Sequence, residues 1–188
     1  MDGYFTREFE INGHLTLTFY QREVGDVSCV VWDAALVLAK YLERRCKDVK
    51  DWLHGRSVLE LGAGLGCVGL TAACLGARVI MTDLDEVIPL MEKNVEANKN
   101  IWSASGGEIC TKSVEPLIQT LCAVTGVKTE IIISQEERDT EKQLRVWKNF
   151  QQALQEHFDV IKVPEEDQHP EFYSSDIVIL HARKKVGS

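Results

Sequence analysis

The residues with the clearest chemistry in this sequence are four glycines that lie close together. Gly62, Gly64, Gly66 and Gly69 follow a short apolar run that begins at Val58. Glycine has no side chain, so a ligand can reach the backbone N–H groups at the start of the helix that follows such a turn. The spacing therefore predicts the nucleotide-binding turn of an α/β domain. The alternative is a glycine-rich turn that binds nothing.

Two acidic residues lie near these glycines and bear on which nucleotide binds. Asp83 follows a second apolar run, 78–82, and an acid about 20 positions beyond such glycines typically hydrogen-bonds ribose hydroxyls. Glu60 precedes Gly62, where its charge would repel a pyrophosphate but would suit an ammonium and a sulfonium. We therefore predict S-adenosylmethionine as the cofactor. An NAD-dependent oxidoreductase is the alternative, because Gly64–Gly69 has dinucleotide spacing, but the sequence contains no Tyr-x-x-x-Lys.

Strands and helices must alternate along the chain to position this turn, and that order indicates an α/β fold with a doubly wound sheet. Asn12-Gly13 predicts a tight turn between two N-terminal strands. Gly76 and Asp85 are predicted to cap helices at a C-terminus and an N-terminus. The predicted strands are 5–11, 14–20, 58–61, 78–82, 108–112, 129–134, 158–163 and 177–182, the last two antiparallel. The predicted helices are 29–43, 70–75, 86–98, 113–126 (capped by Ser113) and 136–157.

Trp32 opens the predicted helix 29–43, directly before the glycine-rich unit. Apolar residues recur at helical spacing along this helix, and an aromatic residue in such a pattern is usually part of the core. Because the helix immediately precedes the cofactor turn, Trp32 can instead form a wall of the cofactor pocket. Both interpretations stay open on the sequence alone.

Composition and charge narrow the class of protein. The chain has 188 residues, 45% of them hydrophobic, which suits a single domain over 1–188. Its 21 basic and 29 acidic residues give a net charge of −8, which argues against nucleic-acid binding and is compatible with a cationic protein substrate. No apolar stretch approaches about 18 residues, so we expect no membrane span. The N-terminus has neither the basic start nor the apolar segment of a signal peptide.

The six cysteines include no Cys-x-x-Cys pair. We interpret them as reduced thiols of a cytoplasmic protein, most of them buried, with a zinc site as the weaker alternative. We therefore expect no metal, and we expect a monomer.

Several of these stretches occur together in one known family. The chain resembles the family-16 methyltransferases, a seven-strand group that depends on S-adenosylmethionine. The stretches that carry the resemblance are Val30–Ala35, Val58–Gly64, Thr82–Leu84, Tyr173–Ile179 and Arg183–Lys185. The resemblance covers residues 4–112 and 113–185. It implies a Rossmann-like seven-strand methyltransferase sheet with an N-terminal β-hairpin and loop (1–28), a cofactor half (29–112) and a C-terminal half (113–188).

The same resemblance implies an activity and a set of site residues. The implied activity is methyl transfer to a lysine ε-amine of a protein, such as an AAA-type ATPase (valosin-containing protein). A lysine must be neutral to attack a methyl group, so the site must desolvate or deprotonate it and align it for in-line attack. The resemblance assigns no catalytic residue. The residues that it places at the cofactor are Trp32, Gly62, Ala63, Gly64 and Asp83, to which the charge argument adds Glu60.

The chain departs from the family pattern after its third predicted parallel strand. Family members continue there to a Trp-Gly and then to a fourth strand that ends in Asp-x-x-Tyr and shapes the acceptor-lysine pocket. In this sequence Lys112 is followed directly by Ser113-Val-Glu-Pro, and no Asp-x-x-Tyr occurs between residues 100 and 130. We therefore expect a sheet without strand four, with unpaired backbone groups along the first parallel strand. This leads to an alternative function, in which the chain is a catalytically inactive or unstable variant that retains at most cofactor or partner binding.

Overall fold

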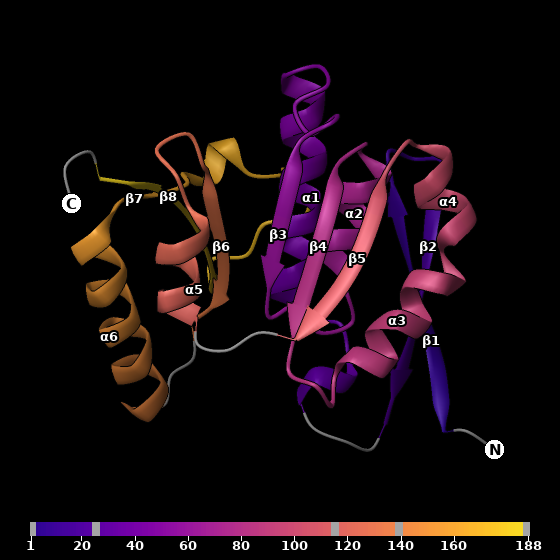
Figure 1. Cartoon of the computed structure of the whole chain (residues 1–188), viewed down its shortest axis with the longest axis horizontal. Helices are drawn as coiled ribbons and strands as arrows, with labels where there is room; N and C mark the ends of the chain where they lie inside the picture. The colour runs from indigo at the N-terminus through magenta and orange to yellow at the C-terminus, as the bar shows by residue number, and fades with distance from the viewer. Residues whose placement is uncertain (1–2, 24–26, 114–116, 138–140, 186–188) are drawn as a thin grey trace. The chain divides into compact units, whose positions relative to one another are not determined.

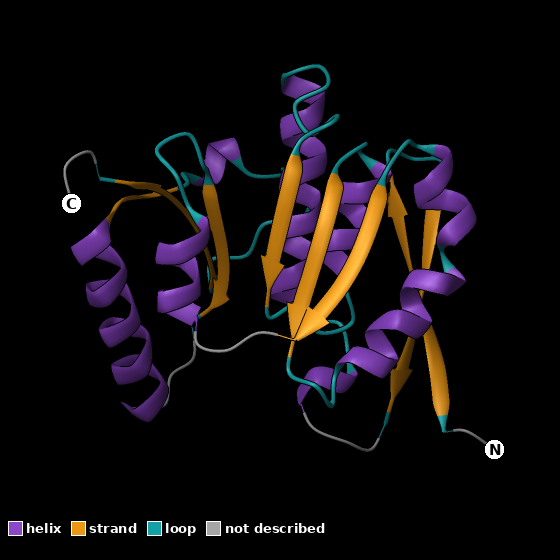
Figure 2. Cartoon of the chain, in the orientation of Figure 1, coloured by secondary structure: helices purple, strands orange, loops and turns teal. Residues whose placement is uncertain are grey.

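The computed structural model of the chain describes residues 3–23, 27–113, 117–137 and 141–185. It divides the chain into unit 1 (Met1–Val114) and unit 2 (Glu115–Ser188). This boundary falls close to the predicted division between the cofactor half and the C-terminal half. Figure 2 shows that each unit contains both helices and strands, as expected for an α/β protein.

Unit 1 begins with the predicted β-hairpin. Strands β1 (Tyr4–Ile11) and β2 (Leu15–Arg22) pair in antiparallel register. Asn12 and Gly13 have φ angles of 55° and 72°, and a two-residue hairpin turn requires such positive values. One face of the hairpin packs into the core of unit 1 through four buried residues, Phe9, Ile11, Leu17 and Phe19.

A three-stranded parallel sheet forms the centre of unit 1, in the order β3-β4-β5. Its strands are β3 (Ser57–Leu61), β4 (Arg78–Asp83) and β5 (Glu108–Ser113). Helices α1 (Asp33–Asp48) and α2 (Cys67–Cys74) lie on one face of this sheet (Figure 1). The alternating strands and helices that the sequence predicted for this region are therefore confirmed.

The edge of β3 that faces away from β4 has no strand partner among the residues that the structure describes. The strands expected to complete a single sheet are instead in unit 2, as a separate three-stranded sheet. Every N–H and C=O along an unpaired strand edge needs another partner, and this holds for the edge of β3 as it does for the outer edge of β5.

Several helix boundaries differ from those predicted. Helix α1 begins at Asp33, after a 3₁₀ turn, η1 (Val27–Cys29), and not at residue 29. Helix α3 (Ile88–Ala97) has Val87 at its N-cap and no side-chain cap, so the predicted cap by Asp85 is wrong. Proline in the first turn starts this helix, because its fixed φ suits a position with no helical N–H partner. A further helix, α4 (Lys99–Ala104), was not predicted.

Unit 2 is an antiparallel sheet with two helices, and β8 (Ile177–Lys184) is its central strand between β6 (Ile131–Glu136) and β7 (Phe158–Lys162). The predicted antiparallel pairing of the last two strands is confirmed. The helices are α5 (Leu117–Val124) and α6 (Glu141–His157), and a 3₁₀ turn, η2 (Glu165–Asp167), follows β7. The predicted helix cap Ser113 is instead the last residue of β5, and the residues between it and α5 lie outside the described part of the chain.

None of the helices in the described ranges is long and apolar enough to cross a membrane.

Candidate cofactor-binding site

The predicted glycine turn and Asp83 come together at the carboxyl edge of the parallel sheet. Strands β3 and β4 run in the same direction with Leu61 opposite Thr82, so the turn after β3 and the end of β4 are neighbours. Ligands of open α/β sheets bind outside the carboxyl ends of their strands. The glycine turn and Asp83, which meet at this edge, both belong to unit 1.

The glycine turn has a backbone that other residues would adopt only with strain. Gly62, Gly64 and Gly66 have φ angles of 70°, 54° and 84°, in the left-handed region that favours glycine. A Cβ built at Gly62 or Gly64 would meet no atom within 4 Å, so open space lies beside this backbone. A ligand can therefore approach the turn closely. Gly66 is the N-cap of α2 and has no side-chain cap, so the helix N-terminus lies in the turn.

Asp83 fixes the turn from the end of β4. Its Oδ2 accepts a hydrogen bond from the Gly64 N–H at 2.7 Å, and its Oδ1 accepts one from the Leu84 N–H at 2.8 Å. An ionised carboxylate has about four lone-pair sites, so about two stay available for ligand hydroxyls. The structure thus gives Asp83 a second role, holding the glycine turn, in addition to the predicted contact with ribose.

Two further hydrogen bonds attach the turn to β4. The Ala63 N–H donates to the Thr82 carbonyl at 3.0 Å, and Thr82 Oγ1 donates to the Glu60 carbonyl at 2.8 Å. Ala63 and Thr82 are both buried. Thr82 was not among the predicted site residues, because its role depends on the pairing of β3 with β4, which local sequence does not contain.

The carboxyl group of Glu60 lies against α2, next to Gly69. A Cβ at Gly69 would lie 2.5 Å from Glu60 Oε2, so the absence of a side chain at Gly69 is what admits this carboxyl group. Oε2 is buried and has no hydrogen-bond partner among the described residues. Burial raises the pKa of Glu60 to about 8; the nearby backbone N–H of Gly69 lowers it, and the charge of Asp83 raises it further. The predicted contact of Glu60 with the cofactor ammonium stays a prediction.

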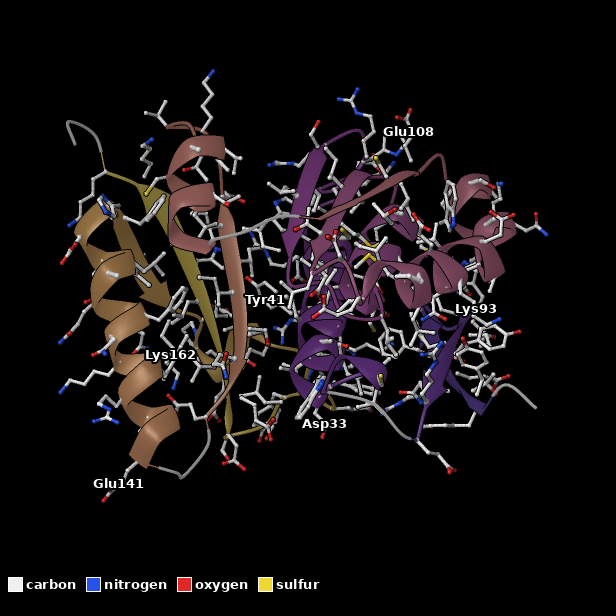
Figure 3. The ribbon with its side chains drawn as sticks, turned by 60° about the horizontal axis from the view of Figure 1, so that its bottom comes forward. Asp33, Tyr41, Lys93, Glu108, Glu141 and Lys162 are labelled. Atoms are coloured by element: carbon white, nitrogen blue, oxygen red, sulfur yellow. The ribbon has the colours of Figure 1, made fainter. Side chains whose placement is uncertain are left out.

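Trp32 lies on the surface at the start of α1. It is the N-cap of that helix, and its carbonyl accepts hydrogen bonds from the N–H groups of Ala35 and Leu36. It is 36% exposed, whereas Trp52 is 8% exposed. This exposure disagrees with a core role and leaves the ring able to contact a ligand. In Figure 3 the labelled Asp33, which follows Trp32, marks the start of α1 on the side turned toward the viewer.

The cysteines do not form a metal site in the part of the chain that the structure describes, where no three His, Cys, Asp or Glu side chains are grouped as metal ligands. Cys67 and Cys74 are buried, Cys110 is exposed and the other three are half-buried. Two of the six are therefore buried, fewer than the majority that was predicted.

A parallel sheet, a glycine turn after its first strand and a carboxylate at the end of the next strand form a Rossmann-like fold, which is shared by methyltransferases that use S-adenosylmethionine. Solved structures with the same fold include the T. thermophilus 16S rRNA N2 G1207 methyltransferase in complex with AdoMet and guanosine (TM-score 0.65, 17% identity, 98% of this chain and 52% of that one). Another is the magnesium protoporphyrin IX methyltransferase of Synechocystis with bound SAH (TM-score 0.51, 15% identity, 81% of this chain and 84% of that one).

The more specific assignment comes from sequence. The lysine methyltransferase family model matches residues 11–112, and this chain belongs to that family. It is 34% identical to the mouse protein N-lysine methyltransferase METTL21A, over 79% of this chain and 77% of that protein. It is 41% identical to the Xenopus tropicalis EEF1A lysine methyltransferase 3, over 46% of this chain and 36% of that protein. The chain is thus an S-adenosylmethionine-dependent enzyme of the protein-lysine N-methyltransferase class.

The residues of this site fit the cofactor. S-adenosylmethionine supplies the methyl group and carries a sulfonium leaving group. The free lone pairs of Asp83 would hold its ribose hydroxyls, and the open backbone of Gly62 and Gly64 allows close approach. The chemical contribution of this half of the protein is binding and alignment, since in-line attack depends on how the reacting atoms are placed.

Proposed function

We propose that this chain methylates a lysine ε-amine of an AAA-type ATPase, valosin-containing protein. The observation that carries the choice of substrate is the stretch Tyr173–Ile179, followed by Arg183–Lys185, which is similar to the lysine methyltransferase of that ATPase. Tyr173 is 47% exposed, and exposed aromatic residues are typical of protein-binding surfaces. The net charge of −8 also favours a substrate segment rich in lysine.

We propose in addition that the protein acts in the cytoplasm and as a monomer. The cysteines support the first part, since all six are free thiols, as expected in a reducing compartment. Size-exclusion chromatography with light scattering tests the second part, and a dimer at micromolar concentration would contradict it.

A second function is favoured by one observation, the open edge of β3. In this alternative the chain binds S-adenosylmethionine but transfers its methyl group slowly or not at all. In the family the acceptor pocket is shaped by a strand that ends in Asp-x-x-Tyr, and no strand of the described residues pairs with the edge of β3 that faces away from β4. Misplacing a reacting atom by about 1 Å can lower the rate on the order of 100-fold. In this alternative we therefore predict little or no lysine methyltransferase activity for this chain.

A radiolabel assay separates these functions. Purified chain is incubated with labelled S-adenosylmethionine and either the AAA-type ATPase or elongation factor 1A, beside a variant in which a family-like fourth strand is inserted after Lys112. Labelling of the ATPase by the strand-restored variant alone supports both the substrate and the low activity of the present chain. Robust labelling by the present chain contradicts the second function, and preferential labelling of elongation factor 1A contradicts the choice of substrate.

A further inference from the structure

Asn94 on α3 and Asn98, the C-cap of that helix, take the place of a neighbouring strand along the free edge of β2. Asn98 Oδ1 accepts a hydrogen bond from the Thr18 N–H at 2.8 Å, and its Nδ2 donates to the Thr18 carbonyl at 2.9 Å. Asn94 pairs in the same way with Tyr20, at 2.7 Å and 3.2 Å. Both side chains are almost fully buried, at 0% and 1% exposure. Because the asparagines are one helical turn apart, they match alternate residues of the strand.

Asn94 makes one contact that Asn98 lacks. Its Nδ2 also donates to the carbonyl of Leu65 at 3.3 Å, in the middle of the glycine turn. The second hydrogen bond of Asn98 Nδ2 goes to the Asn94 carbonyl, within the helix, at 2.8 Å. Asn94 is therefore shared by the hairpin, α3 and the cofactor turn, whereas Asn98 joins only the hairpin and α3.

The orientation of the Asn94 amide follows from its three partners. One partner, the Tyr20 N–H, needs an acceptor, and the other two, the carbonyls of Tyr20 and Leu65, need donors. The flipped amide would direct an oxygen toward two carbonyls and an NH₂ toward an N–H. The oxygen therefore faces the Tyr20 N–H and the nitrogen faces both carbonyls.

The glycine turn needs such anchors because its residues have little conformational preference of their own. Asp83 holds the N–H of Gly64, and Asn94 holds the carbonyl of the next residue, Leu65. Leu65 is 2% exposed, so a carbonyl left without a donor there would be costly. A turn that is already fixed before the ligand arrives loses less entropy on binding.

We propose that Asn94 is a positioning residue for the cofactor, which fixes the glycine turn and couples the N-terminal hairpin to it. The proposal rests on the binding of S-adenosylmethionine at this turn, but not on the identity of the methyl acceptor. The hairpin, which has no predicted cofactor residue, thereby contributes to cofactor affinity.

The test compares Asn94→Asp with Asn98→Asp. Each change keeps the acceptor for a β2 N–H and removes the donors, but only Asn94→Asp releases the glycine turn. Affinity for S-adenosylhomocysteine is measured by calorimetry, and stability without ligand by thermal unfolding. We expect the two variants to lose similar thermal stability. Asn94→Asp should weaken the affinity about tenfold more than Asn98→Asp does, which corresponds to the one additional buried hydrogen bond of Asn94, to the Leu65 carbonyl. Equal losses of affinity would overturn the proposal.

A measurement on the unchanged protein keeps the proposal testable if Asn94→Asp does not fold. S-adenosylhomocysteine should slow hydrogen exchange of the Tyr20 amide, which Asn94 holds, more than that of the Thr18 amide, which Asn98 holds. Equal slowing of both amides would overturn the coupling. If the unchanged chain does not bind S-adenosylhomocysteine, both the cofactor assignment and this proposal are overturned. If it binds normally but the two variants have equal effects on affinity, only this proposal is overturned.

Discussion

Units 1 and 2 are built from similar elements but differ in how their strands run, and this difference decides where a ligand can bind. The three strands of unit 1 are parallel, so the turns after β3 and β4 lie at one edge, and all six predicted cofactor residues belong to this unit. In unit 2 the neighbouring strands are antiparallel, so their carboxyl ends alternate between two edges. The family match at residues 11–112 falls within unit 1. A shared edge of parallel strands is therefore the feature that makes unit 1 the cofactor-binding part.

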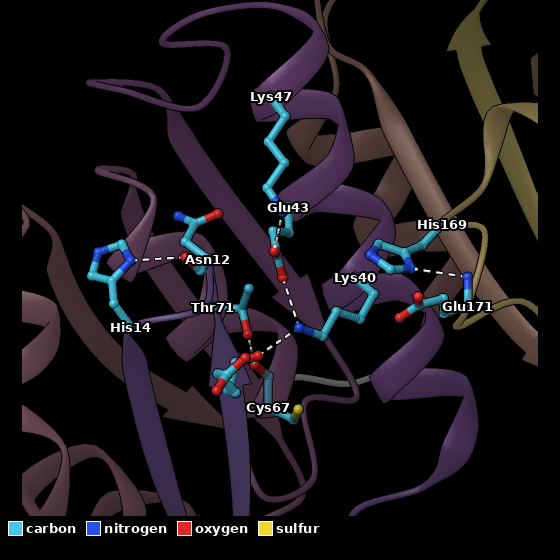
Figure 4. Close-up of polar contacts among 10 residues, drawn as sticks. Asn12, His14, Lys40, Glu43, Lys47, Cys67, Thr71, His169 and Glu171 are labelled. Carbon is cyan, nitrogen blue, oxygen red and sulfur yellow. Dashed lines mark hydrogen bonds and ion pairs between the residues drawn. The ribbon is translucent and has the colours of Figure 1, made fainter.

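The units also differ in how they hold charge. In unit 1 the buried Lys40 donates to the Glu10 carbonyl at 2.5 Å and to Glu43 at 2.8 Å, and Lys47 reaches Glu43 at 2.6 Å (Figure 4). Burial raises the pKa of Glu43, but the hydrogen bonds from the two lysines outweigh it and hold the pKa below its ordinary value. The described ion pair of unit 2, Arg183 with Glu130, is far more exposed.

The largest expected effect on stability comes from breaking the buried ion pair of unit 1. Glu43→Ala should lower the free energy of unfolding by about 3–5 kcal/mol, because it removes the carboxylate that neutralises the buried charge of Lys40. The matched change in unit 2, Glu130→Ala, should cost at most about 1 kcal/mol, since exposed pairs contribute little. Urea unfolding measures both. Equal effects would remove the contrast in how the units hold charge.

The next prediction compares how closely the chain packs around one glycine of each unit, Gly107 in unit 1 and Gly126 in unit 2. A Cβ at Gly107 would lie 2.3 Å from the backbone oxygen of Ala73, which cannot move as a flexible side chain can, whereas a Cβ at Gly126 would meet nothing within 4 Å. Gly107→Ala should therefore lower stability by about 1–3 kcal/mol, as overpacking does. Gly126→Ala should stay within about 0.5 kcal/mol of the unchanged protein. A stability loss at Gly126 as large as at Gly107 would mean that unit 2 is packed more closely at this turn.

The prediction for Asp83 tests whether the carboxylate at the end of β4 in unit 1 binds the cofactor. Asp83→Ala should weaken affinity for S-adenosylhomocysteine by about 1–3 kcal/mol, since it removes the acceptor for ribose hydroxyls and for the Gly64 N–H. Asp159→Ala, on the surface of unit 2, is the control and should change affinity little. Calorimetry measures both. If NAD raised the melting temperature and S-adenosylhomocysteine did not, the cofactor assignment would be wrong.

In unit 1 the strands and turns were predicted from the sequence better than the contacts between them. Strands, the hairpin turn at Asn12-Gly13 and the glycine turn follow local rules of periodicity and backbone freedom, and all were found. The roles of Thr82 and Asn94 depend on which segments become neighbours after folding, and no local pattern contains that information. The burial of Glu60 was missed for the same reason, because its environment is formed by α2. In the resemblance-based prediction the parallel strands of unit 1 and the strands of unit 2 belonged to one sheet, whereas in the structure they form two separate sheets in addition to the hairpin.

Glu60 should make the stability of the protein depend on pH. Burial raises its pKa from 4.5 to about 8, so between these values the folded chain binds a proton that the unfolded chain releases. The stability contributed by the protonated group is complete below about pH 4.5 and is lost as the pH rises toward 8, at up to about 1.4 kcal/mol per pH unit. Glu60→Gln, which stays neutral, should flatten this dependence by about 1–2 kcal/mol between pH 6 and 8.

The control for Glu60 is Glu156→Gln, an exposed position on α6 of unit 2. Thermal unfolding is recorded at several pH values for both variants. An unchanged pH dependence in Glu60→Gln would show that Glu60 is ionised in the folded protein and would favour its predicted contact with the ammonium of the cofactor.

The smallest expected effect is that of Trp32→Ala on cofactor affinity. It tests whether the cofactor site extends to the start of α1. Trp32 is 36% exposed at the N-cap, whereas Leu36, one turn later, packs against the core of unit 1. Trp32→Ala should therefore weaken affinity for S-adenosylhomocysteine by about 1 kcal/mol, through lost contact with the ligand, while changing stability little. Leu36→Ala should do the opposite, lowering the melting temperature with little effect on affinity. Calorimetry and thermal unfolding of both variants separate the two roles. Equal effects on affinity would exclude Trp32 from the cofactor site and confine that site to the turn and the end of β4.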